Sequence, residues 1–134
     1  MIKKKVCLLG AFCVGKTSLV RHFVHSKFDE SYHSTLGVKI DMKVVATDEG
    51  EVMMLLWDVA GEEELFQIPD SYIAGSSACL FVADGTRPET LETLKMIRER
   101  VFSKLGNDLP NAILFNKSDL VDDWKLTEED RLAL

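Results

Sequence analysis

The 134-residue sequence lacks an apolar run long enough to cross a membrane, because none reaches the ~18 residues that a spanning helix requires. Its N-terminus lacks a signal-peptide pattern, and Met1-Ile2 excludes N-myristoylation. Residues 131–134 include no cysteine for prenylation. We therefore expect a cytoplasmic location without direct membrane insertion, and membrane attachment only if a longer natural chain carries a lipidation site.

Cysteine is scarce and odd in number, and Cys7, Cys13 and Cys79 lie in or beside segments that look buried. Such cysteines suit reduced thiols in a cytosol better than a disulfide framework. We expect Cys13 to be a small filler residue rather than a reactive thiol.

Positive charge is also scarce. The formal net charge is -6 and the isoelectric point is near 5.0. Lys3-Lys4-Lys5 is the only basic run, and at a chain end it indicates a solvated strand start. This balance argues against a nucleic-acid partner, whose phosphates demand a basic face.

What is present is typical of one soluble globular domain. Hydrophobic residues make up 46% and charged residues 28% of the chain, and its length is sufficient for one core. No internal repeat, low-complexity tract or linker interrupts the sequence. We expect a single domain over residues 1–134.

Residues 10–17 have the form G-x-x-x-x-G-K-[ST], between a β-like run and a helical pattern. This context predicts a phosphate-binding loop whose backbone N–H groups wrap phosphate oxygens, which a Cβ atom at Gly10 or Gly15 would obstruct. Lys16 would reach the β- and γ-phosphates, and Thr17 would ligate Mg²⁺. The residues expected around the phosphates are Gly10, Val14, Gly15, Lys16, Thr17 and Ser18.

A second motif, Asp58-Val59-Ala60-Gly61, stands at the end of another strand. Asp58 could hold Mg²⁺ through water, and the Gly61 N–H could meet the γ-phosphate. In isolation, an aspartate at a strand end followed by a turn glycine is more often structural. Its significance depends on the other two motifs.

The third motif, Asn116-Lys117-x-Asp119, indicates which base is bound. The Asp119 carboxylate can accept two hydrogen bonds from the ring N–H and the exocyclic amine of guanine. Adenine lacks this pair of donors and would leave the carboxylate unpaired. Asn116 and the stem of Lys117 would line the base and the phosphate loop. The three motifs together therefore predict GTP or GDP with Mg²⁺.

Strands alternate with helices along the chain, which predicts an α/β fold with a mainly parallel sheet. One antiparallel hairpin is expected over residues 37–58, and a long exposed loop over residues 26–35. The other strands are expected over residues 6–9, 78–83 and 112–115. Helices are expected over residues 16–25 and 88–105, and a short helix is expected to end near residue 73. A last helix is expected to begin at the capping box over residues 127–130. All three polar motifs fall at strand ends, where such folds bind ligands.

These residues resemble the small GTPases of the Ras superfamily, and most closely the Rab branch, over about residues 3–130. Beyond the three motifs, the resemblance rests on Ser34-Thr35-Leu36-Gly37-Val38, the run from Leu56 to Glu63, Ser71-Tyr72-Ile73 and Ala83-Asp84-Gly85-Thr86. It implies a three-layer P-loop NTPase sandwich.

The resemblance also implies roles for single residues. Thr35 would place its hydroxyl on Mg²⁺ and its N–H on the γ-phosphate, and Phe28 would pack against the guanine edge. Effector, exchange and activating proteins would bind through residues 32–41 and 57–73. Contacts with the γ-phosphate would hold these two segments, and hydrolysis of GTP would release them. The residues expected to face an effector are Leu36, Ile40, Trp57 and Tyr72. Core packing is the alternative for the aromatic ones, and for Trp57 the two are balanced.

Two departures from the family concern hydrolysis. Glu62 stands where the family has the glutamine that orients the attacking water, and an ionised carboxylate has no N–H to donate. It could still accept a proton if its pKa were raised, so the direction of its effect is open. Phe12 is bulkier than the usual residue and could crowd an activator's arginine finger. The expected catalytic residues are Glu62, Gly61, Lys16 and Thr35, and the expected metal ligands are Thr17, Thr35 and Asp58.

The sequence ends at Leu134, before the last strand, the S-A-K-type loop and the C-terminal helix of the family. Either it is a truncated piece, or its sheet is completed otherwise, for example by another chain. Apolar surface exposed by the missing helix predicts self-association or marginal stability.

The sequence favours a Mg²⁺-dependent GTP-binding switch that hydrolyses GTP slowly to GDP. One alternative is a nucleotide-dependent interaction module that binds GTP with little or no hydrolysis. Glu62 and Phe12 favour this module, whereas intact Thr35 and Asp58 oppose a wholly inert site. A second alternative is a P-loop ATPase or kinase, against which Asp119 argues.

Overall fold

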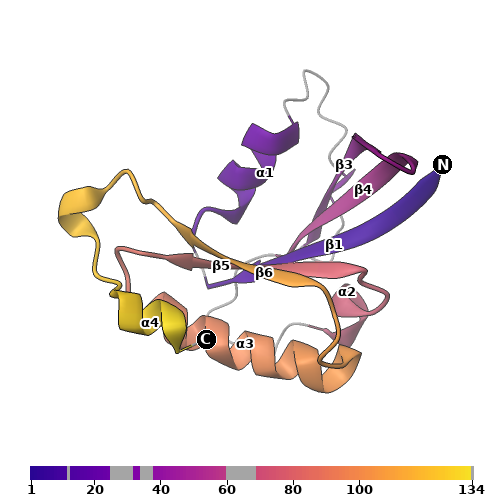
Figure 1. The fold of residues 1–134 in the computed structure, drawn as a ribbon. Helices are drawn as coiled ribbons and strands as arrows, with labels where there is room; N and C mark the ends of the chain where they lie inside the picture. Colours follow the sequence, from indigo (N-terminus) through magenta and orange to yellow (C-terminus); the bar gives the residue numbers. More distant parts are fainter. Residues whose placement is uncertain (12, 25–31, 34–37, 60–68, 134) are drawn as a thin grey trace.

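The computed structural model describes residues 1–11, 13–24, 32–33, 38–59 and 69–133 (Figure 1). Within them, a six-stranded sheet has the order β2-β3-β4-β1-β5-β6. The strands are β1 (Ile2–Gly10), β2 (Tyr32–His33), β3 (Val38–Thr47), β4 (Gly50–Val59), β5 (Ala78–Asp84) and β6 (Asn111–Asn116). The helices are α1 (Lys16–Val24), α2 (Asp70–Ile73), α3 (Glu89–Leu105), α4 (Glu128–Leu132) and a 3-10 helix over Val121–Asp123.

Parallel pairing brings the ends of the motif-bearing strands to one edge of the sheet. β1 pairs in parallel with β4 on one side and with β5 on the other, and β5 pairs in parallel with β6. Leu8 lies opposite Asp58, and Asp84 lies opposite Asn116. The three polar motifs predicted from the sequence therefore begin at the same edge.

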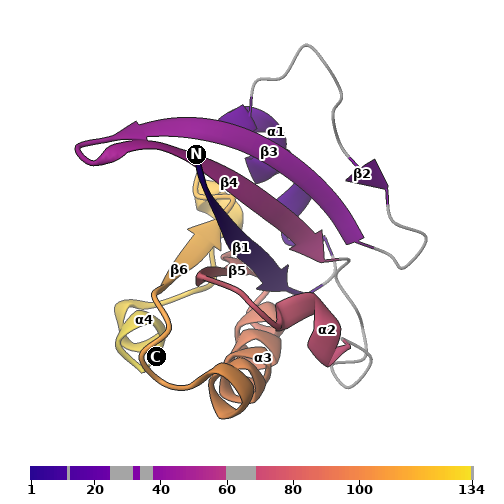
Figure 2. The same ribbon diagram turned by 90° about the vertical axis from the view of Figure 1, so that its right-hand side faces the viewer.

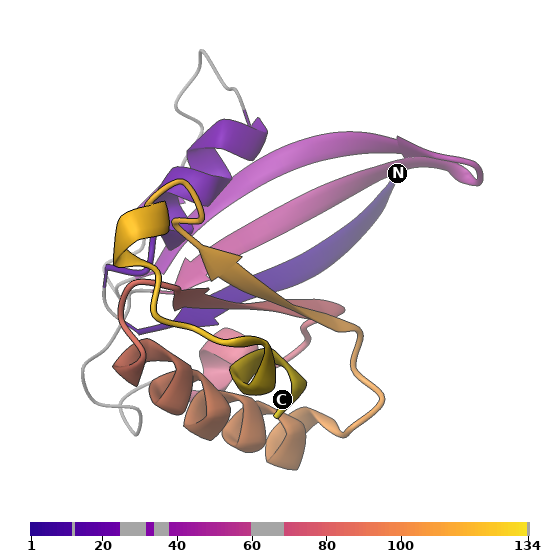
Figure 3. The ribbon, with the colours of Figure 1, turned by 60° about the vertical axis from the view of Figure 1, so that its left-hand side comes forward.

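The sheet is covered by helices on both faces, as a three-layer architecture requires. Figure 2 shows α1 on one face and α2, α3 and α4 on the other, and Figure 3 shows α4 alongside α3. The larger core lies under α3 and includes Cys7, Phe81 and Ile73, whereas α1 packs through Val20 against Leu8 and Leu56. The predicted α/β sandwich with a mainly parallel sheet is confirmed.

Helix α3 forms because its apolar residues recur at helical spacing. Leu91, Leu94, Ile97 and Val101 are all buried, at 3% exposure or less. Pro88 precedes the first turn, and Gly106, with φ of +92°, ends the helix by donating its N–H to Phe102 O. The stripe and both ends agree with the prediction over residues 88–105.

The predicted hairpin is also present, with small shifts at its boundaries. β3 and β4 pair from Val38↔Val59 to Thr47↔Gly50. Gly50, predicted to lie in the turn, instead begins β4 with φ of +119°, so the turn is two residues long. Thr47 Oγ1 donates to Gly50 O at 2.6 Å and accepts a bond from Glu49 N, which stabilises this turn.

One expectation for the loops needs correction, and one short helix was not predicted. Residues 32–33 do not lie in a loop but form β2, which pairs antiparallel with β3 at Ile40 and Lys39. The rest of the loop predicted over 26–35 falls outside the described residues. The 3-10 helix over Val121–Asp123 was not predicted, whereas the capping box at Thr127 and Asp130 is present with both of its hydrogen bonds.

The cysteines and the basic run agree only partly with their predictions. All three cysteines are free thiols, and Cys7 and Cys79 are buried, whereas Cys13, expected to be a small filler residue, is exposed. The N-terminal lysines are solvated at Lys3 and Lys4, whereas Lys5 is half-buried and donates to Ala74 O at 2.8 Å. Among the described residues, no helix has the length and apolar character needed to cross a bilayer.

Candidate functional site

The loop between β1 and α1 is shaped by two glycines that leave no room for a side chain. A Cβ atom on Gly10 would lie 2.4 Å from the Val82 carbonyl oxygen, and one on Gly15 would lie 2.2 Å from the Asn116 amide nitrogen. Gly15 also has φ of +99°, which side chains rarely adopt. The backbone of the loop therefore packs directly against β5 and against the end of β6.

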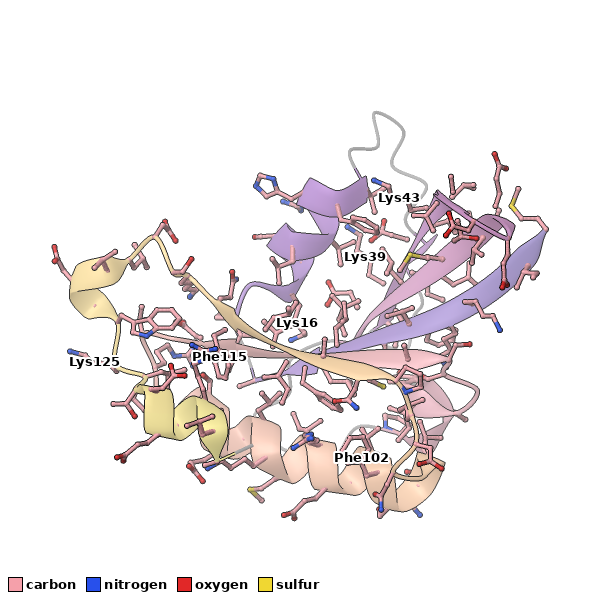
Figure 4. The ribbon with its side chains drawn as sticks, in the orientation of Figure 1. Lys16, Lys39, Lys43, Phe102, Phe115 and Lys125 are labelled. Carbon is pink, nitrogen blue, oxygen red and sulfur yellow. The ribbon has the colours of Figure 1, made fainter. Side chains whose placement is uncertain are left out.

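The Lys16 side chain folds back over this loop. It is only 6% exposed, and its ammonium donates to the carbonyl oxygens of Gly10 at 3.4 Å and Ala11 at 3.3 Å. Figure 4 shows it between the start of α1 and the sheet. Burial lowers the pKa of Lys16, and the nearby Asp58 carboxylate opposes that shift. A phosphate group would supply the anionic acceptor that a buried ammonium needs.

Two oxygen ligands suited to a hard cation meet beside Lys16. Thr17 Oγ1 donates to Asp58 Oδ2 at 2.5 Å, and Asp58 is 6% exposed. Mg²⁺ is usually held by one or two protein oxygens together with water and substrate phosphates. Within the described ranges, no group of three or more His, Cys, Asp or Glu side chains could hold a metal ion. The pair therefore fits Mg²⁺ that is shared with a phosphate, rather than a site made of protein ligands alone.

The end of β6 is joined to the phosphate loop by two side chains. Asn116 Nδ2 donates to Val14 O at 2.9 Å, and Lys117 Nζ donates to Cys13 O at 3.1 Å. Asp119 lies exposed in the turn that follows, closed by the Leu120 N–H bond to Lys117 O at 3.0 Å. The third motif thus contacts the first across more than a hundred positions of sequence.

One residue that the motifs did not identify lies at the centre of these contacts. Asp84, at the end of β5, is fully buried, and its carboxylate lies 2.7 Å from Lys117 Nζ. Burial opposes ionisation of Asp84, but the bonds from Lys117 and Thr86 outweigh it and lower the pKa of the carboxyl. The available sequence signal was an acidic residue placed directly after the apolar run over residues 78–83.

The structure brings together most of the predicted site residues that it describes. Ser18 lies exposed in the first turn of α1, and Asp119 approaches the loop only through its neighbours Asn116 and Lys117. The residues gathered at the loop are Gly10, Val14, Gly15, Lys16, Thr17, Asp58, Asn116 and Lys117. Phe12, Phe28, Thr35, Gly61 and Glu62 lie outside the described residues.

Of the residues expected to face an effector, Tyr72 takes the alternative role of core packing. Tyr72 is only 9% exposed and belongs to the core under α3. Ile40 and Trp57 are half-buried against that core, and Lys5 Nζ lies 3.7 Å from the centroid of the Trp57 ring. The partial exposure of Trp57 is consistent with both of its predicted roles, contact with an effector and core packing. Leu36 lies outside the described residues.

Comparison with known proteins gives a consistent assignment. The family model described as "Ras family" matches residues 5–134. The mouse Ras-related protein Rab-7b is 35% identical over 128 residues, which are 93% of this chain and 64% of that protein. The human Ras-related protein Rab-22A is 36% identical over 126 residues, 94% of this chain and 65% of that protein. The chain thus spans less than two thirds of the length of these relatives.

The fold and the loop geometry define a P-loop protein of the small GTPase type. The match of the family model to nearly the whole chain makes the assignment more specific: this chain belongs to the Ras family. Its relatives named above are Rab proteins, in agreement with the resemblance drawn from the sequence.

Proposed function

We propose that this chain is a guanine-nucleotide switch that binds GTP with Mg²⁺, hydrolyses it slowly to GDP and binds partner proteins according to the nucleotide. The observation that carries the proposal is the junction of two motifs, in which Asn116 and Lys117 bond the carbonyls of Val14 and Cys13. A base held by the third motif is thereby positioned relative to phosphates held by the first. Membership of the Ras family supports the same function.

The phosphate loop would bind the phosphates through its backbone N–H groups. Its tight packing against β5 and β6, which leaves no room for a side chain at Gly10 or Gly15, would hold these groups in place. Lys16 would exchange its two long carbonyl contacts for phosphate oxygens. Thr17 and Asp58 would hold Mg²⁺, together with Thr35. Bound Mg²⁺ would neutralise charge on the β- and γ-phosphate oxygens.

The base would be selected by Asp119, because its carboxylate can pair with the two adjacent donors of guanine. Asn116 would fix the turn that carries it, through the bond to Val14 O. Lys117 would lie along the base while its ammonium stays on Asp84 and Cys13 O. Phe28 would cover the guanine edge. These contacts of the half-buried Lys117 ammonium would keep this segment in place before any nucleotide is bound.

Partner proteins would bind over residues 32–41 and 57–73, whose conformation would change with the γ-phosphate through Thr35 and Gly61. Trp57 lies one residue before the proposed Mg²⁺ ligand Asp58 in β4. Its indole ring, held under Lys5, would therefore report nucleotide-dependent changes at this surface. The relatives of this chain named above are Rab proteins. We therefore propose Rab-like effector, exchange and activating proteins as the classes of partner.

The first prediction tests hydrolysis in a single loading. The purified protein is incubated with Mg²⁺ and GTP, excess nucleotide is removed, and bound nucleotide is identified over time by chromatography. We expect GDP to accumulate with a rate constant of about 10⁻⁴ s⁻¹ or less, because an ionised Glu62 cannot donate to the transition state. The Glu62→Gln variant is expected to hydrolyse faster.

The same experiment distinguishes the alternatives. If Glu62→Gln is slower than the unmodified chain, Glu62 acts as the proton acceptor instead. If GTP remains intact on the protein, the chain is a binding module without hydrolysis, which the carboxylate at Glu62 and the bulk of Phe12 favour. If ATP competes with GTP on equal terms, the guanine assignment is wrong.

A second prediction concerns the close approach of the phosphate loop to β6. Replacing Gly15 by alanine places a Cβ atom where Asn116 Nδ2 now lies and strains a backbone with positive φ. We expect GDP affinity to fall by roughly 30-fold or more, from about 2 kcal/mol of strain and lost hydrogen bonding. Titration with a fluorescent GDP analogue measures it.

Gly75→Ala is the matched control for this substitution. Gly75 has φ of +75° and an added Cβ atom would meet nothing within 4 Å. It therefore imposes similar backbone strain away from the site, and should change thermal stability but not the dissociation constant of GDP. Equal losses of affinity in both variants would mean that strain, and not the contact with Asn116, explains the result.

A further inference from the structure

The loop over residues 84–87, which follows β5, joins the phosphate loop to the end of β6. Gly85 N donates to Asn116 O at 3.0 Å, so the loop is bonded to the last residue of β6. Asp84 is fully buried beside it, and its Oδ1 accepts bonds from Thr86 N at 2.8 Å and from Thr86 Oγ1 at 2.6 Å. The carboxylate is therefore held in one orientation by its own loop.

The other oxygen of that carboxylate serves two cations. Asp84 Oδ2 lies 2.7 Å from Lys117 Nζ and 3.9 Å from Arg87 Nη1. Both cations also donate to one backbone oxygen of the phosphate loop, since Cys13 O accepts from Lys117 Nζ at 3.1 Å and from Arg87 Nη1 at 3.5 Å. A single buried anion thus orients two donors toward the same carbonyl.

That carbonyl belongs to a residue in an unfavourable conformation. Cys13 has φ of +60°, a conformation that is strained for a non-glycine residue and persists only where its surroundings hold it. The two hydrogen bonds to its carbonyl provide such support. Arg87 is further held by Glu89, whose carboxylate lies 3.3 Å from Arg87 Nε.

The loop over 84–87 is itself fixed from outside. A Cβ atom on Gly85 would lie within 2.3 Å of three ring atoms of Trp124, so the indole lies flat over this glycine. Lys125 N donates to Gly85 O at 2.8 Å. The segment after the 3-10 helix therefore covers the loop and connects it to the guanine-binding side of the site.

From these contacts we propose that Asp84 and Arg87 are positioning residues that hold the Cys13 carbonyl, and with it the phosphate loop, in the shape that retains a guanine nucleotide. Neither residue needs to touch the nucleotide. They determine the rate of nucleotide release, and the inference rests on the proposed function only for the identity of the ligand. Asp84 acts through both cations, whereas Arg87 acts through its own bond to Cys13 O.

Release of a fluorescent GDP analogue in the presence of excess unlabelled GDP tests this role, as the third prediction. Arg87→Gln is expected to accelerate release about threefold to tenfold, since it removes the partly exposed charged donor that bonds Cys13 O. Asp84→Asn is expected to accelerate it more, about tenfold to a hundredfold, because both cations lose their anion. Arg87→Lys keeps a charged donor and should release at close to the unmodified rate.

Lys95→Gln is the matched control. Lys95 lies on α3, which begins just after Arg87, is exposed to a similar extent (34% against 36% for Arg87) and pairs with Glu92. It should leave release unchanged. Thermal unfolding of the nucleotide-free Arg87→Gln protein should also match that of Lys95→Gln, which separates positioning from a general loss of stability.

The outcomes separate this inference from the proposed function. If the unmodified chain retains no guanine nucleotide, the proposed function fails. If it retains GDP and Arg87→Gln releases at the unmodified rate, the positioning role is wrong. If Arg87→Lys releases as fast as Arg87→Gln, the charged contact is not what holds the loop, and the inference is overturned. Should Asp84→Asn fail to fold, the release rates of Arg87→Gln and Arg87→Lys decide alone.

Discussion

Replacing Asp119 by asparagine is expected to exchange the base that this chain binds, from guanine to xanthine. The carboxylate can accept from two adjacent donors of guanine, and xanthine has a carbonyl oxygen in place of one of them. Asparagine offers one acceptor and one donor, which match xanthine and oppose guanine. We expect GTP affinity to fall by a factor of about 10² to 10⁴, because one hydrogen bond is lost, the other is no longer charge-assisted and one donor faces another.

Competition against a fluorescent GDP analogue by GTP, XTP and ATP measures this exchange. Asp119 is exposed and follows the segment that Asn116 and Lys117 anchor. The substitution should therefore alter base choice without disturbing the loop contacts. Thermal unfolding of the nucleotide-free variant should remain close to that of the unmodified chain.

Asp122→Asn is the control for the change in charge. Asp122 is also exposed, and it lies three residues further along, in the 3-10 helix. It should leave the order GTP, XTP, ATP unchanged. A variant at Asp119 that keeps its preference for GTP would mean that the third motif does not read the base in this chain.

The elements that the sequence predicted well are those whose signal is local. The α3 stripe from Leu91 to Val101 follows helical spacing, and each of its members is buried as that spacing requires. The apolar run of β5 indicates a strand covered on both faces, and Phe81, Val82 and Ala83 have no exposed surface. In both cases, the local sequence pattern is enough to predict which residues are buried.

The position of the three motifs was predictable for a topological reason. Each follows a strand, and parallel strands end at the same edge of a sheet, so the motifs had to gather once the sheet was parallel. The contacts among them were not predictable, because the bond from Asn116 Nδ2 to Val14 O joins residues 102 positions apart. Periodicity carries no information on such pairs.

Residues outside the motifs were missed or misjudged because tertiary context decides them. Asp84 looked like part of a family pattern without a role, yet it is fully buried and pairs with Lys117. For Tyr72 both an effector-facing position and core packing were open, and the short helix α2 places it in the core below the sheet. Strand β2 consists of two residues, too few for a periodic signal.

Replacing Phe81 by alanine is expected to be among the most destabilising single changes in the chain. Phe81 has no exposed surface and lies at the centre of the core between β5 and α3, where its ring meets the edge of the Phe102 ring with centroids 6.1 Å apart. Truncation of a buried phenylalanine to alanine typically costs about 3–5 kcal/mol, from lost burial and the cavity left behind. That is a large share of the ~5–15 kcal/mol available to a domain.

Urea unfolding followed by far-UV circular dichroism measures this loss as a fall in the midpoint at constant slope. Phe81→Leu leaves a smaller cavity and should lose roughly 1–2 kcal/mol, which keeps the prediction measurable if the alanine variant does not fold. Met96→Ala, on the same helix as Phe102 but 55% exposed, should change the free energy of unfolding by less than about 0.5 kcal/mol.

A loss below about 1 kcal/mol for Phe81→Ala would mean that the core collapses around the missing ring. It would also mean that a larger share of the free energy of unfolding comes from the smaller core under α1, formed by Val6, Leu8, Val20 and Leu56. The expected result instead makes the packing between β5 and α3 the part of the fold that holds the strand end at Asp84. Because Asp84 follows Phe81 on the same strand, loss of this packing should also accelerate nucleotide release in the leucine variant.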